Sequence, residues 1–284
     1  MTGIQYITES ADLFEGVEKR IELVFDIHGH IPSSLRSLSN ADITSILDAA
    51  KCAVLVKRTH THFDAYILSE SSLFVYDYKI IILTCGTTTL LCAVPVVIQA
   101  ALVLGLTCVG CQFTRNTYLF PENQVYPHTS FMDECKYLDT HIPKMKNTFN
   151  SCNNTNSKIY SRSKYIWVCY QDSYYTALTK FKKIVYFNIK VMPNYIEKIR
   201  DVLTHLVDMY DDYIFTPCGY SLNGYKDDDY ITIHVTPQSS CSYVSIEYTG
   251  NINISKYDDT LYDILNHFPC TKSDIETDLS CVDV

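Results

Sequence analysis

The segment CAVLVKRTHTHFDAYILSESSLFVYDYKIIILT, residues 52–84, indicates a β-rich region, because apolar and polar side chains alternate along it as in antiparallel strands. The pattern predicts three strands joined by two turns. Within it, Glu70, Ser71 and Ser72 stand together between two apolar runs, and Cys85 follows in a Gly/Thr turn. A hairpin tip needs turn-forming residues, but it does not need a carboxylate, two hydroxyls and a thiol. The same segment is therefore the first candidate for chemistry.

The composition of the whole chain indicates a globular protein. Of its 284 residues, 47% are hydrophobic and 19% are charged, which allows one large domain or two fused halves. The formal net charge of -9 argues against nucleic acid as the main partner, because phosphate binding requires clustered Lys and Arg.

Cysteine usage bears on the compartment. The chain has twelve cysteines, many of them inside apolar runs, where a free thiol behaves as a small hydrophobic group. The first residues, MTGIQYITESADLFEG, contain neither a basic region nor an apolar region of a secretory signal. We therefore expect a reduced, cytoplasmic protein without disulfides.

The run LLCAVPVVIQAALVLGL, residues 90–106, is close to the length that a bilayer requires. Pro95, Gln99 and the absence of basic flanking clusters argue against a membrane span. We expect a buried core helix instead.

The remaining elements suggest an α+β architecture in two similar halves, about 1–150 and 160–284, within one domain. An amphipathic segment at 9–26 should place Glu18, Lys19 and Glu22 on its polar side, and a helix should begin after a cap at Ser39 or Asn40. Polar residues 144–163 form the expected linker. The second half should contain strands at 164–172, 182–191, 230–237 and 241–249, and helices at 195–210 and 257–268.

Three other groups of polar residues are candidate sites. The pair Cys108 and Cys111 lacks a second half at metal-site spacing, and the histidines of HGH and THTH lie in unrelated polar loops. The acidic run 227–229 has the pattern of a solvated hairpin tip. We expect no metal site.

The group around Ser71 fits one unusual reaction. A serine hydroxyl can attack the carbonyl of the preceding residue if the backbone is strained and the oxyanion is stabilised. The amide becomes an ester, elimination splits the chain, and the new N-terminus becomes a pyruvoyl group. That ketone forms a Schiff base with an amine substrate and withdraws electrons during decarboxylation. Taken by themselves, Glu70 and Ser71 are better explained as surface residues of a hairpin.

Five segments, which follow one another along most of the chain, contain distinctive motifs: LFEGVEKRIELVF, YILSESSLFV, IIILTCGTTTLL, YPHTSFMDE and FTPCGYSLNGYKDDDYITIHVTPQSSCSYVSIE. Together they closely resemble the eukaryotic-type S-adenosylmethionine decarboxylases, which are pyruvoyl-dependent. The resemblance implies a four-layer αββα sandwich of two antiparallel sheets flanked by helices. Because the chain ends earlier than the animal enzymes, we expect a second sheet that lacks edge strands. An exposed edge favours a homodimer of processed chain pairs.

The resemblance also assigns the processing residues. It implies autocatalytic cleavage between Glu70 and Ser71, which gives a small chain 1–70 and a large chain 71–284. Ser71 would become the self-derived pyruvoyl cofactor. His234 matches the base that removes the α-hydrogen, and Ser221 matches the serine that hydrogen-bonds the processing intermediate. Cys85 matches the proton donor of the decarboxylation.

Substrate-binding residues follow from the same motifs. Phe14 and Phe215 match the two aromatic residues that sandwich the adenine, and Glu15 and Glu18 match an acidic pair that the family needs for activity. The backbone at Leu68 and Glu70 would contact the edges of the adenine and of the substrate carboxylate.

This sequence departs from the family at two sites. Gln238 stands where a glutamate usually binds the ribose hydroxyls, and an amide lacks the charge-assisted strength. Leu83 replaces a lysine of the charged site near which putrescine acts in animal enzymes. Other acidic members of that site match Glu22, Asp172 and Glu247, so the effect of putrescine stays open.

The sequence thus predicts a zymogen that decarboxylates S-adenosylmethionine and supplies the aminopropyl donor for spermidine and spermine synthesis. A weak or inactive homologue that regulates an active partner is one alternative, favoured by Gln238 and the early end. A pyruvoyl decarboxylase acting on another amino acid is a second alternative, disfavoured by Phe14 and Phe215.

Overall fold

The computed structural model describes residues 14–27, 33–145, 147–153, 164–171, 174, 177–187, 189, 194–238, 242–250, 252, 254–257, 260 and 271–276. These residues form two compact units. The N-terminal unit contains the described residues between 17 and 179, and the C-terminal unit contains residues 14–16 together with those from 180 to 276.

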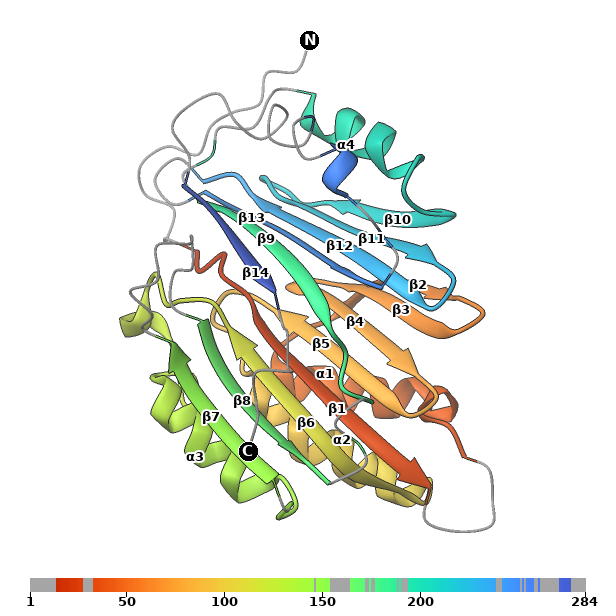
Figure 1. The fold of residues 1–284 in the computed structure, drawn as a ribbon, viewed down its shortest axis with the longest axis vertical. Coiled ribbons are helices and arrows are strands. Elements are labelled where there is room, and N and C mark those ends of the chain that lie inside the picture. The colour runs from red at the N-terminus through yellow and green to blue at the C-terminus, as the bar shows by residue number, and fades with distance from the viewer. Residues whose placement is uncertain are drawn as a thin grey trace. The chain divides into compact units, whose positions relative to one another are not determined.

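The N-terminal unit is built on an antiparallel sheet of eight strands in the order β2-β3-β4-β5-β1-β6-β8-β7 (Figure 1). The strands are β1 (Lys19–Ile27), β2 (Val54–Thr59), β3 (Phe63–Leu68), β4 (Ser71–Tyr76), β5 (Lys79–Thr84), β6 (Leu106–Arg115), β7 (Asn147–Asn153) and β8 (Lys164–Tyr170).

Helices α1 (Asn40–Ala50), α2 (Ala93–Val103) and α3 (Phe131–His141) cover one face of this sheet (Figure 1). Apolar residues of all three helices join the inward side chains of the strands in one core, which contains Ile21, Leu73 and Phe113. The helix prediction at 39–40 is confirmed, because Ser39 caps α1 in a capping box with Asp42.

The central strand β1 differs from its prediction as an amphipathic segment with a solvated polar side. Lys19 and Glu22 are fully buried, and Glu18, just before the strand, is 3% exposed. The helices cover the face that carries Ile21, and a cluster around Leu178 packs against the opposite face. A central strand with two covered faces has no solvated side, so its charged side chains are retained by pairing.

The structure differs from the sequence prediction at two further places. The segment 52–84 forms four strands, because residues 69–70 make an additional tight turn between β3 and β4. The expected linker 144–163 contains β7, and β8, expected in the second half, pairs with both β6 and β7. Both strands therefore belong to the first sheet.

The apolar run at residues 90–106 forms the eleven-residue helix α2, preceded by a short 3-10 turn (Leu90–Cys92). Val94 and Val97 of α2 are buried in the core, as the prediction of a core helix requires. None of the helices in the described ranges is long and apolar enough to cross a membrane.

The C-terminal unit has an antiparallel sheet in the order β10-β11-β12-β13-β9-β14, with α4 (Tyr195–Leu203) packed against it (Figure 1). Its strands are β9 (Phe181–Phe187), β10 (Met209–Ile214), β11 (Tyr220–Lys226), β12 (Asp229–Thr236), β13 (Tyr243–Thr249) and β14 (Thr271–Glu276). The α+β prediction is confirmed, and this sheet has six described strands against eight in the other. The expected helix at 257–268 lies almost entirely outside the described residues.

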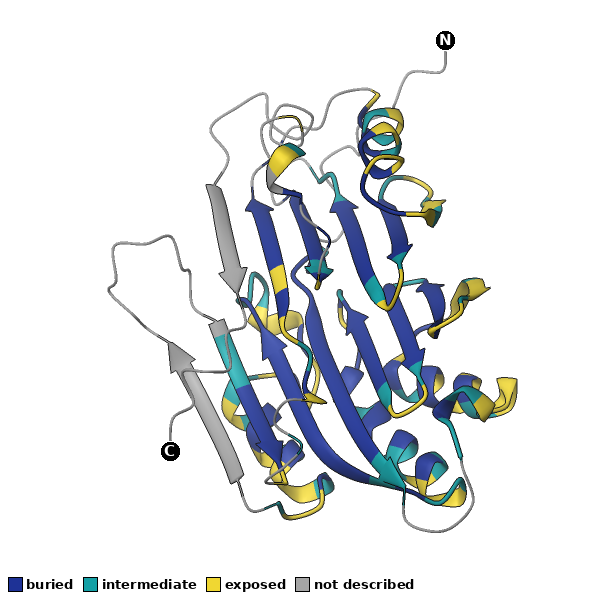
Figure 2. Cartoon of the chain, turned by 45° about the vertical axis from the view of Figure 1, so that its right-hand side comes forward, coloured by how far each residue is buried: buried dark blue, intermediate teal, exposed yellow. Residues whose placement is uncertain are grey.

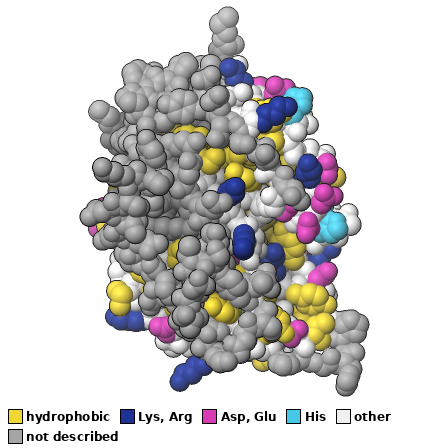
Figure 3. Space-filling model, in the orientation of Figure 1, with side chains coloured by type: hydrophobic (Ala, Val, Ile, Leu, Met, Phe, Trp, Pro, Cys, Tyr) yellow, Lys and Arg dark blue, Asp and Glu magenta, His cyan; other side chains and the backbone are white. Residues whose placement is uncertain are grey.

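The degree of burial depends on where a residue lies in each unit. The strands near the middle of each sheet are almost entirely buried, whereas exposed residues gather on the outer sides of helices and at turns (Figure 2). On the described part of the face in Figure 3, acidic and basic side chains are interspersed.

Candidate active site

The hairpin between β3 and β4 places Ser71 in a strained conformation. Leu68 and Ser71 are register partners, so Ser69 and Glu70 form a two-residue loop. Ser71 has φ of 134°, a positive value that residues with a side chain rarely adopt. Such conformations cost about 1–3 kcal/mol and are found where the surroundings enforce them, often at functional sites. The strain lies directly after the Glu70 carbonyl, at the peptide bond that the sequence predicts to be cleaved.

Cys85 places two donors on the Glu70 carbonyl oxygen. Its backbone N–H donates a hydrogen bond of 3.0 Å to this oxygen, and its Sγ lies 3.4 Å from the same atom. The pairing of Ser71 with Thr84 across β4 and β5 brings the next residue, Cys85, to this position. Two donors that converge on one carbonyl oxygen have the arrangement of an oxyanion hole.

Glu18 holds the Ser71 hydroxyl. Ser71 Oγ donates to Glu18 Oε1 at 2.9 Å, and both residues are buried. The register explains the contact, because Lys19 pairs with Thr84 and Thr84 pairs with Ser71 across three adjacent strands. A nucleophile, a carboxylate acceptor and two donors on the carbonyl thus lie within one unit.

Lys19 is a buried cation beside this group. Its Nζ donates to the Gly86 carbonyl at 2.9 Å and lies 3.4 Å from Gln124 Oε1. Burial raises the pKa of Cys85 well above its usual value, the Glu70 and Glu18 carboxylates raise it further, and Lys19 opposes them. The Cys85 thiol is therefore protonated at neutral pH, the form that an acid requires. Burial also raises the pKa of Glu70, again against Lys19.

The Gly/Thr turn after Cys85 is fixed by its own hydroxyls. Thr88 Oγ1 donates to the Cys85 carbonyl at 2.7 Å, and Thr89 Oγ1 donates to the carbonyl of Ala49 at the end of α1 at 2.7 Å. The polar run thus has a structural use, which is to fix the turn after Cys85 and to join it to α1.

In the C-terminal unit, Ser221 and His234 are register partners on β11 and β12. Ser221 Oγ lies 2.9 Å from His234 Nδ1, and Thr232 Oγ1 lies 2.6 Å from His234 Nε2. Both ring nitrogens therefore have hydroxyl partners, which can donate or accept as the protonation of the ring changes. Sequence reasoning missed Thr232, although its position two residues before His234 places it on the same face of β12.

Phe215 is half-buried at the end of β10. Its N–H donates to the Gly219 carbonyl at 3.0 Å, and its ring meets Tyr213 edge-on at 4.9 Å between centroids. Gly219 has φ of +122° and approaches the Phe215 side chain closely, so a glycine is required there.

Phe14 is also half-buried, and the Gln238 side chain binds its backbone. Phe14 N–H donates to Gln238 Oε1 at 3.0 Å, and Gln238 Nε2 donates to the Phe14 carbonyl at 2.9 Å. Glu15, the next residue, is 2% exposed.

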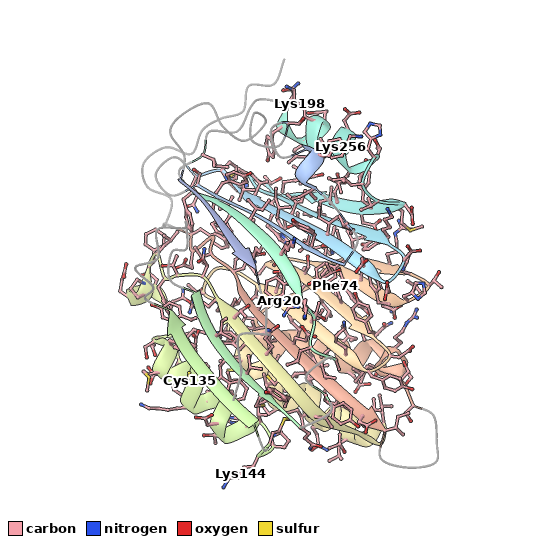
Figure 4. All side chains as sticks on the ribbon, in the orientation of Figure 1. Arg20, Phe74, Cys135, Lys144, Lys198 and Lys256 are labelled. Atoms are coloured by element: carbon pink, nitrogen blue, oxygen red, sulfur yellow. The ribbon has the colours of Figure 1, made fainter. Side chains whose placement is uncertain are left out.

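The acidic residues of the predicted charged site lie in different units. Glu22 Oε2 pairs with Arg20 at 2.9 Å, and Glu22 Oε1 accepts hydrogen bonds of 2.8 Å from the N–H and hydroxyl of Thr179. Arg20, labelled in Figure 4, lies on the central strand β1 and was missed as a member of this site.

Glu247, in the C-terminal unit, accepts from the Tyr230 hydroxyl at 2.7 Å and pairs with Lys183 at 3.4 Å. Asp172 lies outside the described residues. Leu68 and Leu83 are fully buried in the N-terminal unit.

The YPHTSFMDE segment builds a second buried polar cluster. Glu134 accepts from Arg115 at 2.8 Å, from Tyr118 at 2.8 Å and from His128 Nδ1 at 2.7 Å. The N–H of Leu91 donates to His128 Nε2 at 3.3 Å, so the ring is neutral. Burial lowers the pKa of His128 to about 4. These contacts hold the start of the apolar helix against α3.

The family model and the relatives that match this chain carry the same description. Residues 11–277 match the model of a family described as adenosylmethionine decarboxylase. The S-adenosylmethionine decarboxylase proenzyme 3 of Arabidopsis thaliana is 37% identical over 261 residues, covering 85% of this chain and 75% of the relative. The Daucus carota proenzyme is 35% identical over 295 residues, covering 91% and 77%. A crystal structure of the Trypanosoma brucei AdoMetDC-delta26 monomer matches 68% of this chain and 75% of that chain, with 26% identity and a TM-score of 0.49.

Proposed function

The chain belongs to the adenosylmethionine decarboxylase family, and we propose that it cleaves itself between Glu70 and Ser71 to generate the pyruvoyl group with which it decarboxylates S-adenosylmethionine. The product is the aminopropyl donor for polyamine synthesis, and the enzyme acts in the cytoplasm. The observation that carries the proposal is the convergence of Glu18, Cys85 and a strained Ser71 on one peptide bond.

The first step of cleavage uses residues of the N-terminal unit alone. Ser71 Oγ attacks the Glu70 carbonyl carbon while its proton passes to the Glu18 carboxylate. The N–H of Cys85, and its thiol, stabilise the charge that develops on the carbonyl oxygen. The C–N bond then breaks, the proton moves to the Ser71 nitrogen, and an ester remains. Relief of the positive φ at Ser71 favours this direction.

The second step needs a base for the Ser71 α-proton, and we assign His234. Loss of this proton breaks the bond between Cβ and Oγ of residue 71 and releases the main-chain carboxylate of Glu70 as the new C-terminus. The enamine left on residue 71 then takes up water and releases ammonia to give the ketone. The hydroxyls of Ser221 and Thr232 support this assignment, because they hold both nitrogens of the ring while it gains and loses a proton.

In turnover, the ketone supplies an electron-withdrawing centre to which the substrate amine binds. Cys85 then donates its thiol proton to the substrate carbon that lost carbon dioxide, a role that its raised pKa supports. We assign Phe14 and Phe215 to the two faces of the adenine, the Leu68 and Glu70 backbone to the adenine and carboxylate edges, and Gln238 to the nucleoside. We also assign Glu15 to the active site, as one of the two acidic residues needed for activity.

Two finer proposals concern partners. Putrescine would act at the acidic residues Glu22, Asp172 and Glu247, but Glu22 already pairs with the internal cation Arg20, so we propose a weak response. Dimerisation of processed chain pairs would use an exposed sheet edge and is tested by sedimentation.

The test compares the wild type with Ser71→Ala. We expect the wild type to release carbon dioxide from S-adenosylmethionine and Ser71→Ala to remain one inactive chain. An active Ser71→Ala protein would exclude a cofactor derived from Ser71. An inactive, uncleaved wild type would favour a regulatory homologue, and release from another amino acid would favour a changed substrate.

A further inference from the structure

The side chain of Gln238 forms a paired contact with the backbone of Phe14, 224 positions away in the sequence. The Gln238 amide accepts from the N–H of Phe14 and donates to its carbonyl, at 3.0 and 2.9 Å. Each partner uses one donor and one acceptor, as two peptide groups do in an antiparallel ladder. The amide side chain thus takes the place of a neighbouring strand for one residue.

Gln238 is itself held in place. Its N–H donates to the Thr236 carbonyl at 3.0 Å, which forms a tight turn directly after β12. The side chain therefore projects from a defined position at the end of a strand.

The segment that contains Phe14 is fixed at a second point. A Cβ atom on Gly16 would lie 2.8 Å from Cβ of Tyr243, a buried residue of β13 that pairs with Thr236. Since β12 and β13 are neighbours in one sheet, residues 14–16 are held on two adjacent strands of the C-terminal unit. The half-buried ring of Phe14 is carried by this fixed backbone.

We propose that Gln238 is a positioning residue that holds Phe14 for contact with the nucleoside. This inference rests on the proposed function, in which Phe14 stacks on the adenine. The paired contact in this chain requires an amide, because an ionised carboxylate has only acceptors and would face the Phe14 carbonyl with a second oxygen. A protonated carboxyl group restores the pattern, because its O–H donates and its carbonyl accepts.

The pH dependence of Gln238→Glu therefore tests the contact. The first readout is hydrogen exchange of a peptic fragment that covers residues 13–18, compared with the wild type at the same pH. The second is the affinity for 5′-methylthioadenosine, which carries adenine and ribose but lacks the aliphatic amine and the carboxylate of S-adenosylmethionine.

At pH 8 we expect faster exchange in Gln238→Glu than in the wild type. At pH 4, below the ordinary Glu pKa of about 4.3, protonation of the carboxyl group should restore the exchange of Gln238→Glu toward the wild type. The affinity is compared between the wild type and Gln238→Ala, because a carboxylate at position 238 would itself bind the ribose hydroxyls. Gln238→Ala should bind roughly tenfold more weakly, equivalent to the loss of about one hydrogen bond.

Two variants serve as controls. Gln238→Ala should be impaired equally at both pH values, because it has no group to protonate. Gln171→Glu, which makes the same charge change at an exposed residue of the other unit, should match the wild type in both readouts. Equal exchange in the wild type and Gln238→Glu at pH 8 would overturn the inference, as would faster exchange in Gln238→Glu without recovery at pH 4. An unchanged affinity in Gln238→Ala would overturn it as well.

Failure of the inference is distinguishable from failure of the proposed function. If the wild type binds the nucleoside but exchange at Phe14 does not depend on Gln238, the positioning role is wrong and the proposed function stands. If exchange depends on Gln238 but the wild type does not bind the nucleoside, the contact exists without the role in nucleoside binding, and the inference falls with the proposed function.

Discussion

The carbonyl oxygen of Glu70 accepts the backbone N–H of Cys85 at 3.0 Å, and the Cys85 thiol lies 3.4 Å from the same oxygen. One residue therefore offers both a fixed donor and a titratable donor to the carbonyl of the Glu70–Ser71 peptide bond. The backbone donor survives every substitution of Cys85 except proline, whereas the thiol does not. This difference separates chain cleavage from turnover.

Cys85→Ala should still cleave, because the backbone N–H remains, although more slowly. Decarboxylation should fall at least a hundredfold, since general acids typically contribute 10²–10⁴-fold. The two rates are measured by a gel time course and by carbon dioxide release from the fully cleaved fraction. Normal turnover would show that Cys85 is not the proton donor.

Glu18→Gln should slow cleavage by roughly a hundredfold or more, because an amide can accept the Ser71 hydrogen bond but cannot take its proton. The half-time of precursor loss after refolding measures the effect. The control is Glu122→Gln, which makes the same change at an exposed residue of the same unit. Equal half-times for the wild type and Glu18→Gln would leave Glu18 without a part in proton transfer.

His128 should make the protein less stable as the pH falls from 6.5 toward 4. Its pKa is lowered to about 4 in the fold, so the unfolded chain binds a proton first and unfolding is favoured at acid pH. A shift of this size corresponds to about 3 kcal/mol in the free energy of unfolding. Urea unfolding at pH 7 and pH 5 should show a smaller difference for His128→Gln than for the wild type. The exposed His62→Gln control should retain the wild-type difference.

Phe215→Ala should raise the KM for S-adenosylmethionine about tenfold and leave chain cleavage unchanged, because the ring is assigned to the adenine and not to the processing residues. The neighbouring Ile214→Ala, at a residue that is 54% exposed, is the matched control. An unchanged KM in Phe215→Ala would exclude the stacking role.

The closeness of Glu70, Ser71 and Cys85 was predictable because their motifs are close in the sequence. LSESS runs into the start of β4, and TCGTT begins at the end of β5. A single turn joins β4 to β5, so a hairpin brings the two motifs together. The contact of Glu18 with Ser71 spans 53 positions and depends on the register of β1, β5 and β4. The sequence motifs indicate Glu18 and Ser71 as candidate site residues, but they do not indicate that the two side chains contact each other.

The errors have a common physical origin. The polar side of β1 was expected in solvent because periodicity records polarity and not whether a second layer covers it. The strand β7 lies in a polar stretch, because an edge strand can pair through its backbone without an apolar pattern. The contact of Gln238 with Phe14 joins residues that no periodicity relates.

The first measurement is the intact mass of freshly purified protein, with a denaturing gel and a carbonyl-reactive label. We expect two chains, residues 1–70 and residues 71–284, the larger with a blocked N-terminus that takes up the label. A single chain of 284 residues with an unmodified Ser71 would contradict self-processing and remove the proposed electron-withdrawing group.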